Sequence, residues 1–418
     1  MMRYSALGLL KGGLDGHKSW TRAWRAPEPK ARYDVIVIGG GGHGLATAYY
    51  LANVHGLRNV AVLEKGWIGG GNTGRNTTIV RSNYRLPQMQ NLLELSLKLW
   101  EGLSQELNYN LMFSQRGALF LGHSDSDMTR LAERGDSLRC NGIDADLLDR
   151  DAVARLVPLL DMSQTARYPI HGGLIQKRGG TARHDAVAWG YARAADALGV
   201  DIIQNCEVTG IDIEGGKAVG VRTNRGAIGA DRIGICVAGN SSLVAAMTGL
   251  RLPIESHMLQ AFVSEPVKPM IDTVIMSQSI HCYISQSDKG EIVLGGDPDL
   301  YPSYSQRGIP MRIEEVAGQA IGLVPALSRL RMLRCWSGVT DMSFDGAPII
   351  GATPVDGLYL NGGWCYGGFK ATPGSGWLYA HTLAKGEPHP VNAPFALDRF
   401  ARGALIDEAA SGPLPQSR

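Results

Sequence analysis

The stretch that decides the fold runs from Tyr33 to Glu64 and reads YDVIVIGGGGHGLATAYYLANVHGLRNVAVLE. The apolar run Val35–Ile38 leads directly into the glycine motif GGGGHG at residues 39–44, and a helical pattern of small and apolar residues follows. A second apolar run, Val60–Leu63, ends in the acid Glu64, about twenty residues after the last glycine. Strand, glycines, helix, strand and acid in this order predict a βαβ unit that binds a dinucleotide.

Each part of this unit has a physical task. Gly39 permits the tight turn after the strand, Gly41 lets a pyrophosphate approach the backbone, and Gly44 lets the helix pack closely on the sheet. The helix N-terminus offers free N–H groups and the positive end of its dipole to the phosphates. Glu64 is expected to accept hydrogen bonds from a ribose.

Composition and charge limit the classes of function. The chain has 418 residues and a net charge of +2, which gives no electrostatic reason to expect nucleic acid or an anionic membrane as a partner. Its six cysteines show no CxxC pair and no metal-ligand spacing, and no apolar run reaches transmembrane length. We therefore expect a cytoplasmic protein with reduced thiols, no metal site and no membrane segment.

The segment after Glu64, KGWIGGGNTGRNTTIVRSNY at residues 65–84, is rich in glycine, asparagine and threonine. It offers backbone N–H groups, hydroxyls and guanidinium donors, so it is expected to wrap the diphosphate and ribityl chain of a flavin-size dinucleotide. Arg81 at its far end is positioned to hold a substrate carboxylate. A solvated loop, with Arg81 as a surface charge, is the alternative.

The remaining chain alternates between helical and strand patterns. Helices are predicted over 87–107, 127–141, 149–157 with Asp149 as the capping residue, 186–198 and 311–323. Strands are predicted over 116–122, 201–204, 207–213, 218–223 and 231–237, the last of which returns to the parallel sheet. Strands at 258–263, 281–285 and 291–294 suit an antiparallel sheet over the substrate.

Near the C-terminal end, a strand, a glycine-rich turn and a helix form NGGWCYGGFKATPGSG at residues 361–376. The helix N-terminus and Lys370 would stabilise negative charge on a reduced flavin. This segment, WSGVTDMSFDGAPIIG at 336–351 and the nucleotide unit together resemble the FAD-dependent amine oxidoreductases, a family that includes D-amino-acid and glycine oxidases and monomeric sarcosine oxidase. Within that family the chain is most similar to the β subunits of bacterial heterotetrameric sarcosine oxidases, through residues 71–84, 183–210 and 361–376.

The resemblance implies the fold class: an α/β chain in which an FAD-binding Rossmann-like nucleotide domain of the glutathione-reductase type is interwoven with an antiparallel-sheet substrate domain. The expected FAD-binding parts are 33–115, 171–250 (with the FMN attachment site) and 336–390, and the expected substrate-domain parts are 116–170 and 251–335. Residues 1–32 form an N-terminal extension and 391–418 a C-terminal tail. The only apolar patch of the extension breaks after a few residues, so we do not expect a signal peptide. With Trp20 and Trp24, the extension is too aromatic for a plain disordered leader, so we expect it to pack on a neighbouring chain or domain.

The resemblance also implies two flavins. FAD is bound noncovalently, and FMN is attached to a histidine within a basic-His-Asp triplet, which matches Arg183-His184-Asp185 here. Taken alone, His184 would be read as a capping or packing histidine, and His171 is the rival position. The FAD-binding residues implied are Gly39, Gly41, Gly42, His43, Gly44, Glu64, Asn72, Thr73, Arg75, Asn76, Val208, Gly363, Gly367, Gly368 and Lys370.

The substrate residues implied by the resemblance are Arg81 and Lys370, which match the arginine and lysine that bind the amino-acid carboxylate. Two positions depart from the monomeric enzymes. Gly338 stands where those enzymes attach FAD to a cysteine, Cys335 being out of register, and Val293 replaces their oxygen-activating lysine. Both departures fit noncovalent FAD that passes its electrons to FMN.

The implied activity is oxidation of sarcosine to glycine, with O2 reduced to hydrogen peroxide and with formaldehyde or 5,10-methylenetetrahydrofolate as the one-carbon product. The implied partners are the α, γ and δ subunits of a heterotetramer, with tetrahydrofolate and NAD bound by the α subunit. The β chain of a proline or opine dehydrogenase and a nonenzymatic FAD-bound scaffold are the alternatives.

Overall fold

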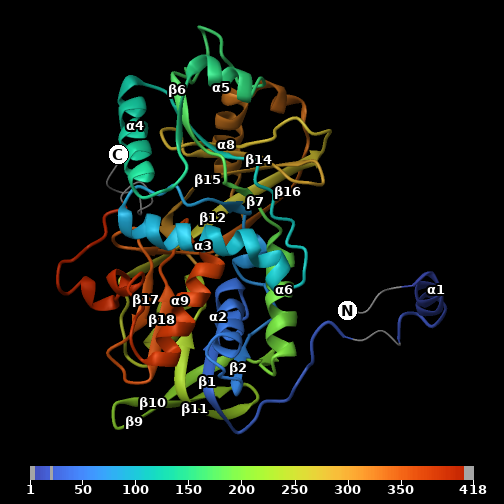
Figure 1. The fold of residues 1–418 in the computed structure, drawn as a ribbon, viewed down its shortest axis with the longest axis vertical. Coiled ribbons are helices and arrows are strands. Elements are labelled where there is room, and N and C mark those ends of the chain that lie inside the picture. Colours follow the sequence, from blue (N-terminus) through green and yellow to red (C-terminus); the bar gives the residue numbers. More distant parts are fainter. Residues whose placement is uncertain (1–4, 19–21, 409–418) are drawn as a thin grey trace.

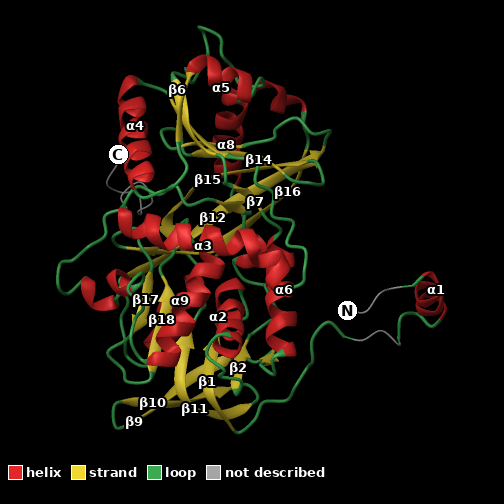
Figure 2. Ribbon diagram, in the orientation of Figure 1, coloured by secondary structure: helices red, strands yellow, loops and turns green. Residues whose placement is uncertain are grey.

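The computed structural model describes residues 5–18 and 22–408. Two large sheets lie one above the other along the long axis of the molecule, with helices packed around them (Figures 1 and 2). The pattern of elements is the α/β fold class predicted from the sequence.

The first sheet contains the predicted nucleotide unit. Its strand order is β17-β18-β11-β1-β2-β8, and β1 pairs in parallel with both β2 and β11. The antiparallel strands β9 and β10 extend it beside β11. The strands are β1 Arg32–Ile38, β2 Val60–Leu63, β8 Asp201–Ile203, β9 Val208–Glu214, β10 Lys217–Thr223, β11 Gly226–Ile235, β17 Ile349–Ala352 and β18 Leu358–Gly362. All four residues of β2 are buried, as expected for a central parallel strand.

Helices cover this sheet and carry the segments that meet at the nucleotide site. They are α2 Gly42–Asn53, α3 Pro87–Glu106, α6 His184–Ala197, α7 Ser241–Ala246 and α9 Thr372–Lys385. Helices α2 and α9 touch closely: a Cβ on Gly376 would lie 2.4 Å from that of Ala46. The first turn of α9 is thereby held beside the first turn of α2.

The second sheet has the order β16-β12-β15-β14-β13-β4-β6-β5. Its pairs are antiparallel except β13 and β4, which are parallel. The strands are β4 Ala118–Gly122, β5 Asp146–Asp149, β6 Gly172–Gln176, β12 Ile254–Pro266, β13 Val274–Ser277, β14 Cys282–Gln286, β15 Glu291–Pro302 and β16 Met332–Ser343. The helices around it are α4 Asp125–Cys140, α5 Arg150–Leu156 and α8 Pro310–Leu323. The predicted cap of α5 is confirmed, since Asp149 Oδ1 accepts from Ala152 N at 2.7 Å.

Two of the expected domain boundaries fall inside the second sheet. Strand β6 pairs with β4 and β5 although it follows position 171, and β16 runs through position 336 while paired with β12 as far as Ser343. Glycines and polar residues interrupt the apolar pattern of both strands, so the change of sheet is not visible in the sequence. We propose boundaries after Gln176 and after Ser343.

The N-terminal extension has two different parts. Helix α1, Ala6–Leu14, stands apart from the body (Figure 1). Trp24 packs against the core beside the first sheet, and Arg25 Nε donates to Asp196 Oδ1 at 2.8 Å. Trp20, the other tryptophan of the extension, lies outside the described residues.

Short elements complete the fold: β3 Ile79–Val80 pairs with β7 Gly180–Thr181. Six 3-10 helices occur among residues 5–18 and 22–408: η1 Thr73–Arg75, η2 Ala238–Asn240, η3 Pro325–Arg329, η4 Phe369–Ala371, η5 Ala393–Phe395 and η6 Leu397–Arg399. Within the part of the chain that the structure describes, no helix has the length and apolar character needed to cross a membrane.

Candidate active site

The glycine turn between β1 and α2 is fixed by steric need. Gly39 has φ +110°, and a Cβ there would lie 2.3 Å from the Cys236 carbonyl oxygen. A Cβ on Gly44 would lie 2.0 Å from the Gly39 oxygen, so α2 packs against its own turn. Gly41, the N-cap of α2, meets only Thr73 Oγ1 at 3.2 Å. The Gly42 N–H donates to Thr73 Oγ1 at 2.9 Å. The next N–H groups in the first turn of α2 have no carbonyl partner within the helix, so they are the ones available to a phosphate.

Glu64 lies at the end of β2, where the fingerprint requires an acid. Its Oε2 accepts from Gly40 N and its Oε1 from Gly66 N, both at 2.8 Å. These bonds hold the carboxylate at the mouth of the turn, the position from which an acid reaches a ribose.

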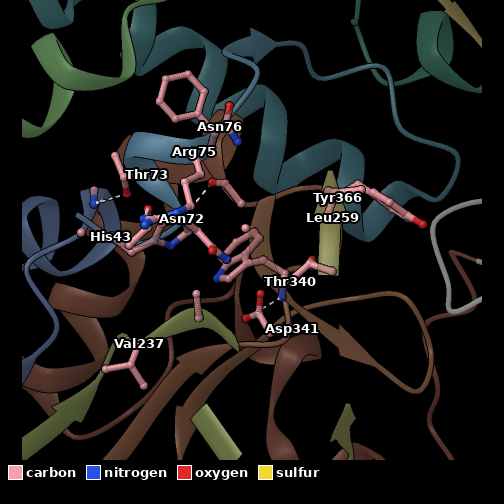
Figure 3. Close-up of a pocket in the computed structure, with 18 of the residues that line it drawn as sticks. His43, Asn72, Thr73, Arg75, Asn76, Val237, Leu259, Thr340, Asp341 and Tyr366 are labelled. Carbon is pink, nitrogen blue, oxygen red and sulfur yellow. Dashed lines mark hydrogen bonds between the residues drawn. The ribbon is translucent and has the colours of Figure 1, made fainter. Parts of the chain in front are cut away.

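The loop after β2 packs against β16. Asn72 Oδ1 accepts from Val339 N at 3.0 Å, and Asn72 Nδ2 donates to the Val339 oxygen. Arg75 donates to the Gly71 oxygen and to Gln306 Oε1, each at 3.0 Å. Figure 3 shows Asn72, Thr73, Arg75 and Asn76 close together in the pocket, with Thr340 and Asp341 of β16 also drawn.

His43 connects α2 to the final glycine-rich turn. Its Nε2 lies 2.7 Å from the Gly368 oxygen and its Nδ1 2.8 Å from Ser375 Oγ. Because a carbonyl can only accept, Nε2 carries the proton. Burial lowers the pKa of His43 to about 4, so the ring is neutral and serves to hold the two turns together.

These segments enclose a pocket of about 640 Å³, within the size range of cofactor and ligand sites. Most of the residues predicted to bind FAD or substrate line it: Gly39, Gly41, Gly42, His43, Glu64, Asn72, Thr73, Arg75, Asn76, Arg81, Val208, Gly368 and Lys370. Four predicted residues do not line it: Gly44, Gly363, Gly367 and His184. Gly44 and Gly363 instead shape the backbone beneath the pocket.

Asp341 was missed in the sequence. It lies on β16 in the pocket wall beside Thr340 (Figure 3), and its Oδ2 accepts from Gly363 N at 2.6 Å and Trp364 N at 3.2 Å. Burial raises the pKa of Asp341 to about 6. The carboxylate thus fixes the glycine-rich turn before η4. No local pattern marked Asp341, because several other polar residues lie in the same strand.

Arg81 and Lys370 both line the pocket beside the Tyr84 ring, in the part that we call the substrate end. The Arg81 guanidinium lies 4.4 Å from the centre of the Tyr84 ring, and Lys370 Nζ lies 5.8 Å from it. Lys370 Nζ donates to the Tyr366 oxygen at 2.6 Å. Burial, followed by the nearby Arg81 charge, lowers the pKa of Lys370 well below its usual range. The surroundings of Lys370 therefore favour a bound anion, which would restore the charge of the lysine.

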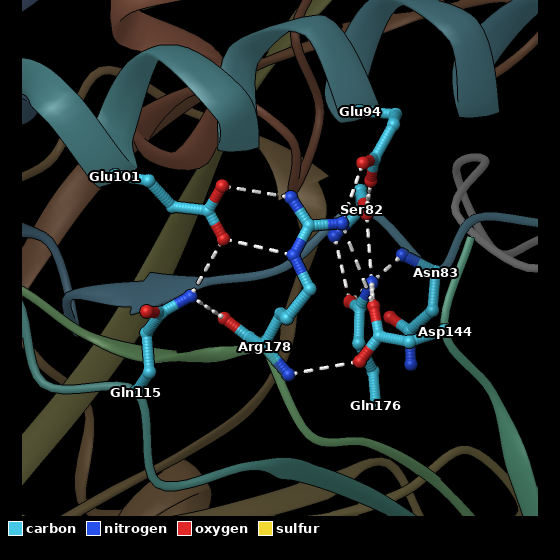
Figure 4. A network of polar contacts seen from close by, with 8 residues as sticks. All are labelled: Ser82, Asn83, Glu94, Glu101, Gln115, Asp144, Gln176 and Arg178. Carbon is cyan, nitrogen blue, oxygen red and sulfur yellow. Dashed lines mark hydrogen bonds and ion pairs between the residues drawn. The ribbon is translucent and has the colours of Figure 1, made fainter. Parts of the chain in front are cut away.

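A polar network fixes the backbone next to Arg81 (Figure 4). Gln176 Oε1 accepts from Ser82 N at 2.9 Å and from Asn83 N at 3.2 Å. Ser82 Oγ donates to Glu94 at 2.7 Å, and Glu94 accepts from Arg178 at 2.6 Å. These buried hydrogen bonds fix the backbone directly after Arg81, and the sequence did not reveal them.

His184 begins α6, outside this pocket. The neighbouring Arg183 donates to Asp185 at 2.9 Å, so the two charged residues of the triplet pair with each other. His184 Nδ1 is buried and has no hydrogen-bond partner among the described residues. Burial lowers the pKa of His184, leaving a neutral imidazole. His171, the rival position, lies near the surface with Nδ1 3.1 Å from Asp125 Oδ1.

The cysteines in the pocket wall are poor nucleophiles. Gly338 lies in the pocket wall next to Asn72, and Cys335 does not line the pocket. Four other cysteines do line it, and burial raises the pKa of each thiol, to about 12 for two of them, Cys282 and Cys365; the other two are Cys206 and Cys236. Among the described residues, no group of three or more His, Cys, Asp or Glu side chains could hold a metal ion.

A dinucleotide turn that opens into a pocket with a half-buried arginine and a buried lysine is typical of a flavin-dependent amine oxidoreductase. The family model described as FAD dependent oxidoreductase matches residues 34–382. The predictions of the fold class and of FAD as a cofactor are therefore confirmed.

Full-length relatives narrow the class. The chain is 61% identical over 414 residues to the protein named sarcosine oxidase subunit beta from Rhizobium meliloti (strain 1021), covering 99% of each chain. It is 52% identical over 411 residues to the protein of that name from Rhodobacter capsulatus, covering 98% of this chain and 99% of the relative. The chain belongs to the FAD-dependent oxidoreductases and, within them, to the family of sarcosine oxidase β subunits.

Among solved structures, L-proline dehydrogenase from P. horikoshii superposes with a TM-score of 0.85 at 28% identity. The match covers 91% of this chain and all of the other. The two-sheet arrangement is thus shared with an enzyme named for a different secondary amine.

Proposed function

We propose that this chain oxidises sarcosine (N-methylglycine) as the β subunit of a multi-subunit oxidase. The observation that carries the proposal is that Arg81 and Lys370 both line the FAD pocket beside the Tyr84 ring, where two cationic side chains favour a carboxylate. The names of the two full-length relatives support the choice of substrate and the subunit assembly.

The side chains of this pocket bind and orient the substrate. Arg81 offers guanidinium donors to the carboxylate, and Lys370 offers a second donor from the η4 turn. Fixing the carboxylate directs the N-methyl C–H bond of the substrate toward the flavin position. Bound FAD supplies the hydride acceptor for this chemistry. No side chain is assigned as a base, because the amine can bind uncharged.

We propose that FAD is held without a covalent bond. The first N–H groups of α2 and Glu64 would bind its diphosphate and ribose, and the loop at 72–76 would lie along the chain that joins them. Gly338 presents no thiol, and the thiols of Cys282 and Cys365 are largely protonated at neutral pH.

We propose His184 as the attachment site of FMN. A neutral imidazole with an unpaired buried nitrogen fits a covalent bond to a flavin. The nearby cations of Arg183, Arg334 and Lys289 fit the negative charge of its phosphate.

The wider reaction follows from these sites. Sarcosine is the proposed electron donor, FAD the first acceptor, FMN the second and O2 the last, giving hydrogen peroxide. Glycine is the product, together with formaldehyde or 5,10-methylenetetrahydrofolate. The α, γ and δ subunits are the proposed partners, with tetrahydrofolate and NAD in the α subunit.

Anaerobic titration of the purified complex tests the substrate. We expect sarcosine to bleach the flavin absorbance near its visible maximum, and L-proline to do so only at far higher concentration. The likeness to L-proline dehydrogenase makes proline oxidation the second candidate. Preferential bleaching by L-proline would replace sarcosine with proline as the substrate.

Acid precipitation tests the FMN site. A yellow wild-type pellet and a colourless His184→Ala pellet are expected, because only a covalent flavin survives denaturation. His171→Ala is the matched control and should leave the pellet yellow. A colourless wild-type pellet from flavin-replete complex would remove the covalent site.

A further inference from the structure

The C-terminal tail reaches the loop that carries Arg81. The side chain of Glu408 is buried, with Oε1 accepting from Arg85 N at 2.5 Å and Oε2 from Leu86 N at 2.9 Å. Leu86 is the N-cap of α3 and has no side chain suited to capping. A carboxylate from 322 residues away therefore caps α3, directly after the Arg81 loop.

A buried ion pair anchors the tail. Arg399 donates to both oxygens of Asp345 at 2.8 Å, and the two side chains are at most 1% exposed. Ile406 N also donates to Asp345 Oδ2 at 3.0 Å, and Glu408 N to the Asp345 oxygen at 3.2 Å. The backbone of the tail around Glu408 is thus anchored to Asp345, independently of the bonds that the Glu408 side chain makes.

A second guanidinium, that of Arg134, lies near the same aromatic ring as that of Arg81. Arg134 on α4 lies 4.3 Å from the centre of the Phe120 ring, and Arg81 lies 5.0 Å from it. The hydrogen bonds of both guanidiniums go to neutral amide oxygens of Asn83 and Gln278. Arg134 Nε is buried without a partner among the described residues.

Charge at this end of the pocket is unbalanced. Burial and the nearby Arg81 lower the pKa of Arg134 to about 9, while Glu408 acts in the opposite direction on both arginines. Glu408 is the carboxylate that opposes both shifts.

We propose that Glu408 is a positioning residue that fixes the Arg81 loop, and that its charge makes the site favour substrates with one carboxylate over those with two. The inference rests on the proposed function and deepens it by naming a residue that sets the substrate class. A second carboxylate on the substrate would be repelled by the like charge of Glu408 beside Arg81 and Arg134.

The test measures the affinity of the flavin-loaded complex for two small acids, acetate and malonate, from the change that each causes in the flavin absorbance spectrum. Glu408→Gln keeps the size of the side chain and removes its charge. We expect its preference for malonate over acetate to rise about tenfold. Glu387→Gln, an exposed change of the same kind, should leave the preference unchanged.

A purely structural role for Glu408 would weaken both acids by the same factor, and an unchanged malonate-to-acetate preference would therefore overturn the inference. Arg134→Gln is the second variant and remains informative if Glu408→Gln does not fold. Because it removes a positive charge near the site, it should lower the affinity for acetate about tenfold. A wild-type affinity for acetate in that variant would also overturn the inference. A wild-type complex that binds neither acid would instead overturn the carboxylate site itself and with it the proposed function.

Discussion

The two ends of the pocket are built in different ways. The nucleotide end is centred on one continuous stretch, residues 33–76, in which backbone geometry and absent side chains leave room for a diphosphate. The substrate end is assembled from a loop, the η4 turn, helix α4 and a tail residue 323 positions from its partner. The nucleotide end depends on the room left by missing side chains. The substrate end depends on charged side chains that distant parts of the chain hold in place.

The two ends should therefore fail differently when changed. The nucleotide end should respond to added atoms, and the substrate end to altered charge. Three changes test this difference, beginning with the largest expected effect.

Gly44→Ala should destabilise the whole fold. Its Cβ would lie 2.0 Å from the Gly39 oxygen, which requires the backbone to move, at a cost on the order of 2–4 kcal/mol. Gly41→Ala meets only Thr73 Oγ1 at 3.2 Å, so it should keep its melting temperature and lose FAD affinity. Thermal melting of the apoprotein and FAD titration separate the two effects. Equal stability of the two variants would contradict the steric account.

Arg81→Met should act on substrate without affecting the nucleotide end. Loss of the guanidinium should lower kcat/KM for sarcosine at least a hundredfold, since a charged hydrogen-bonded pair contributes about 3 kcal/mol. FAD content should remain at the wild-type value. Arg58→Met, at an exposed position, is the control in the same steady-state assay. Parallel loss of FAD and activity would show that Arg81 serves the fold instead.

Asp341→Asn should produce the smallest change, visible as altered pH dependence. The folded-state pKa of Asp341 is about 6, above its ordinary value of 3.8, so the wild type loses stability as pH rises from about 4 to about 6. The asparagine variant lacks this loss, and the difference should amount to on the order of 1–3 kcal/mol. Urea unfolding of both apoproteins between these pH values measures it. Identical slopes would show that the carboxylate does not titrate in this range.

Local features of the fold were predictable, and features that join distant segments were not. The glycine turn, helix α3 and the Asp149 cap follow from neighbouring residues, because steric and hydrogen-bonding rules act over one or two turns of chain. The resemblance supplied the roles of Arg81 and Lys370 as residues that bind the substrate carboxylate. Asp341 and Glu408 carry no local signal, since each caps a backbone segment that is remote in sequence.

The two domain boundaries that we propose to move, to Gln176 and Ser343, depend in the same way on pairing between segments distant in sequence. Strand β16 keeps its place in the second sheet through pairing with β12, and its partner residues lie far away in sequence. A local pattern reveals a strand but not the sheet that accepts it.

The tail contact gives the molecule an order of completion during synthesis. Both sheets have all their strands once Gly362 has been made, and α9 ends at Lys385. The Arg81 loop, made early, then remains without its capping carboxylate until Glu408 leaves the ribosome. A nascent chain can therefore shape its nucleotide turn well before it has a finished place for substrate, and a protease that removed the tail would return the enzyme to that unfinished state.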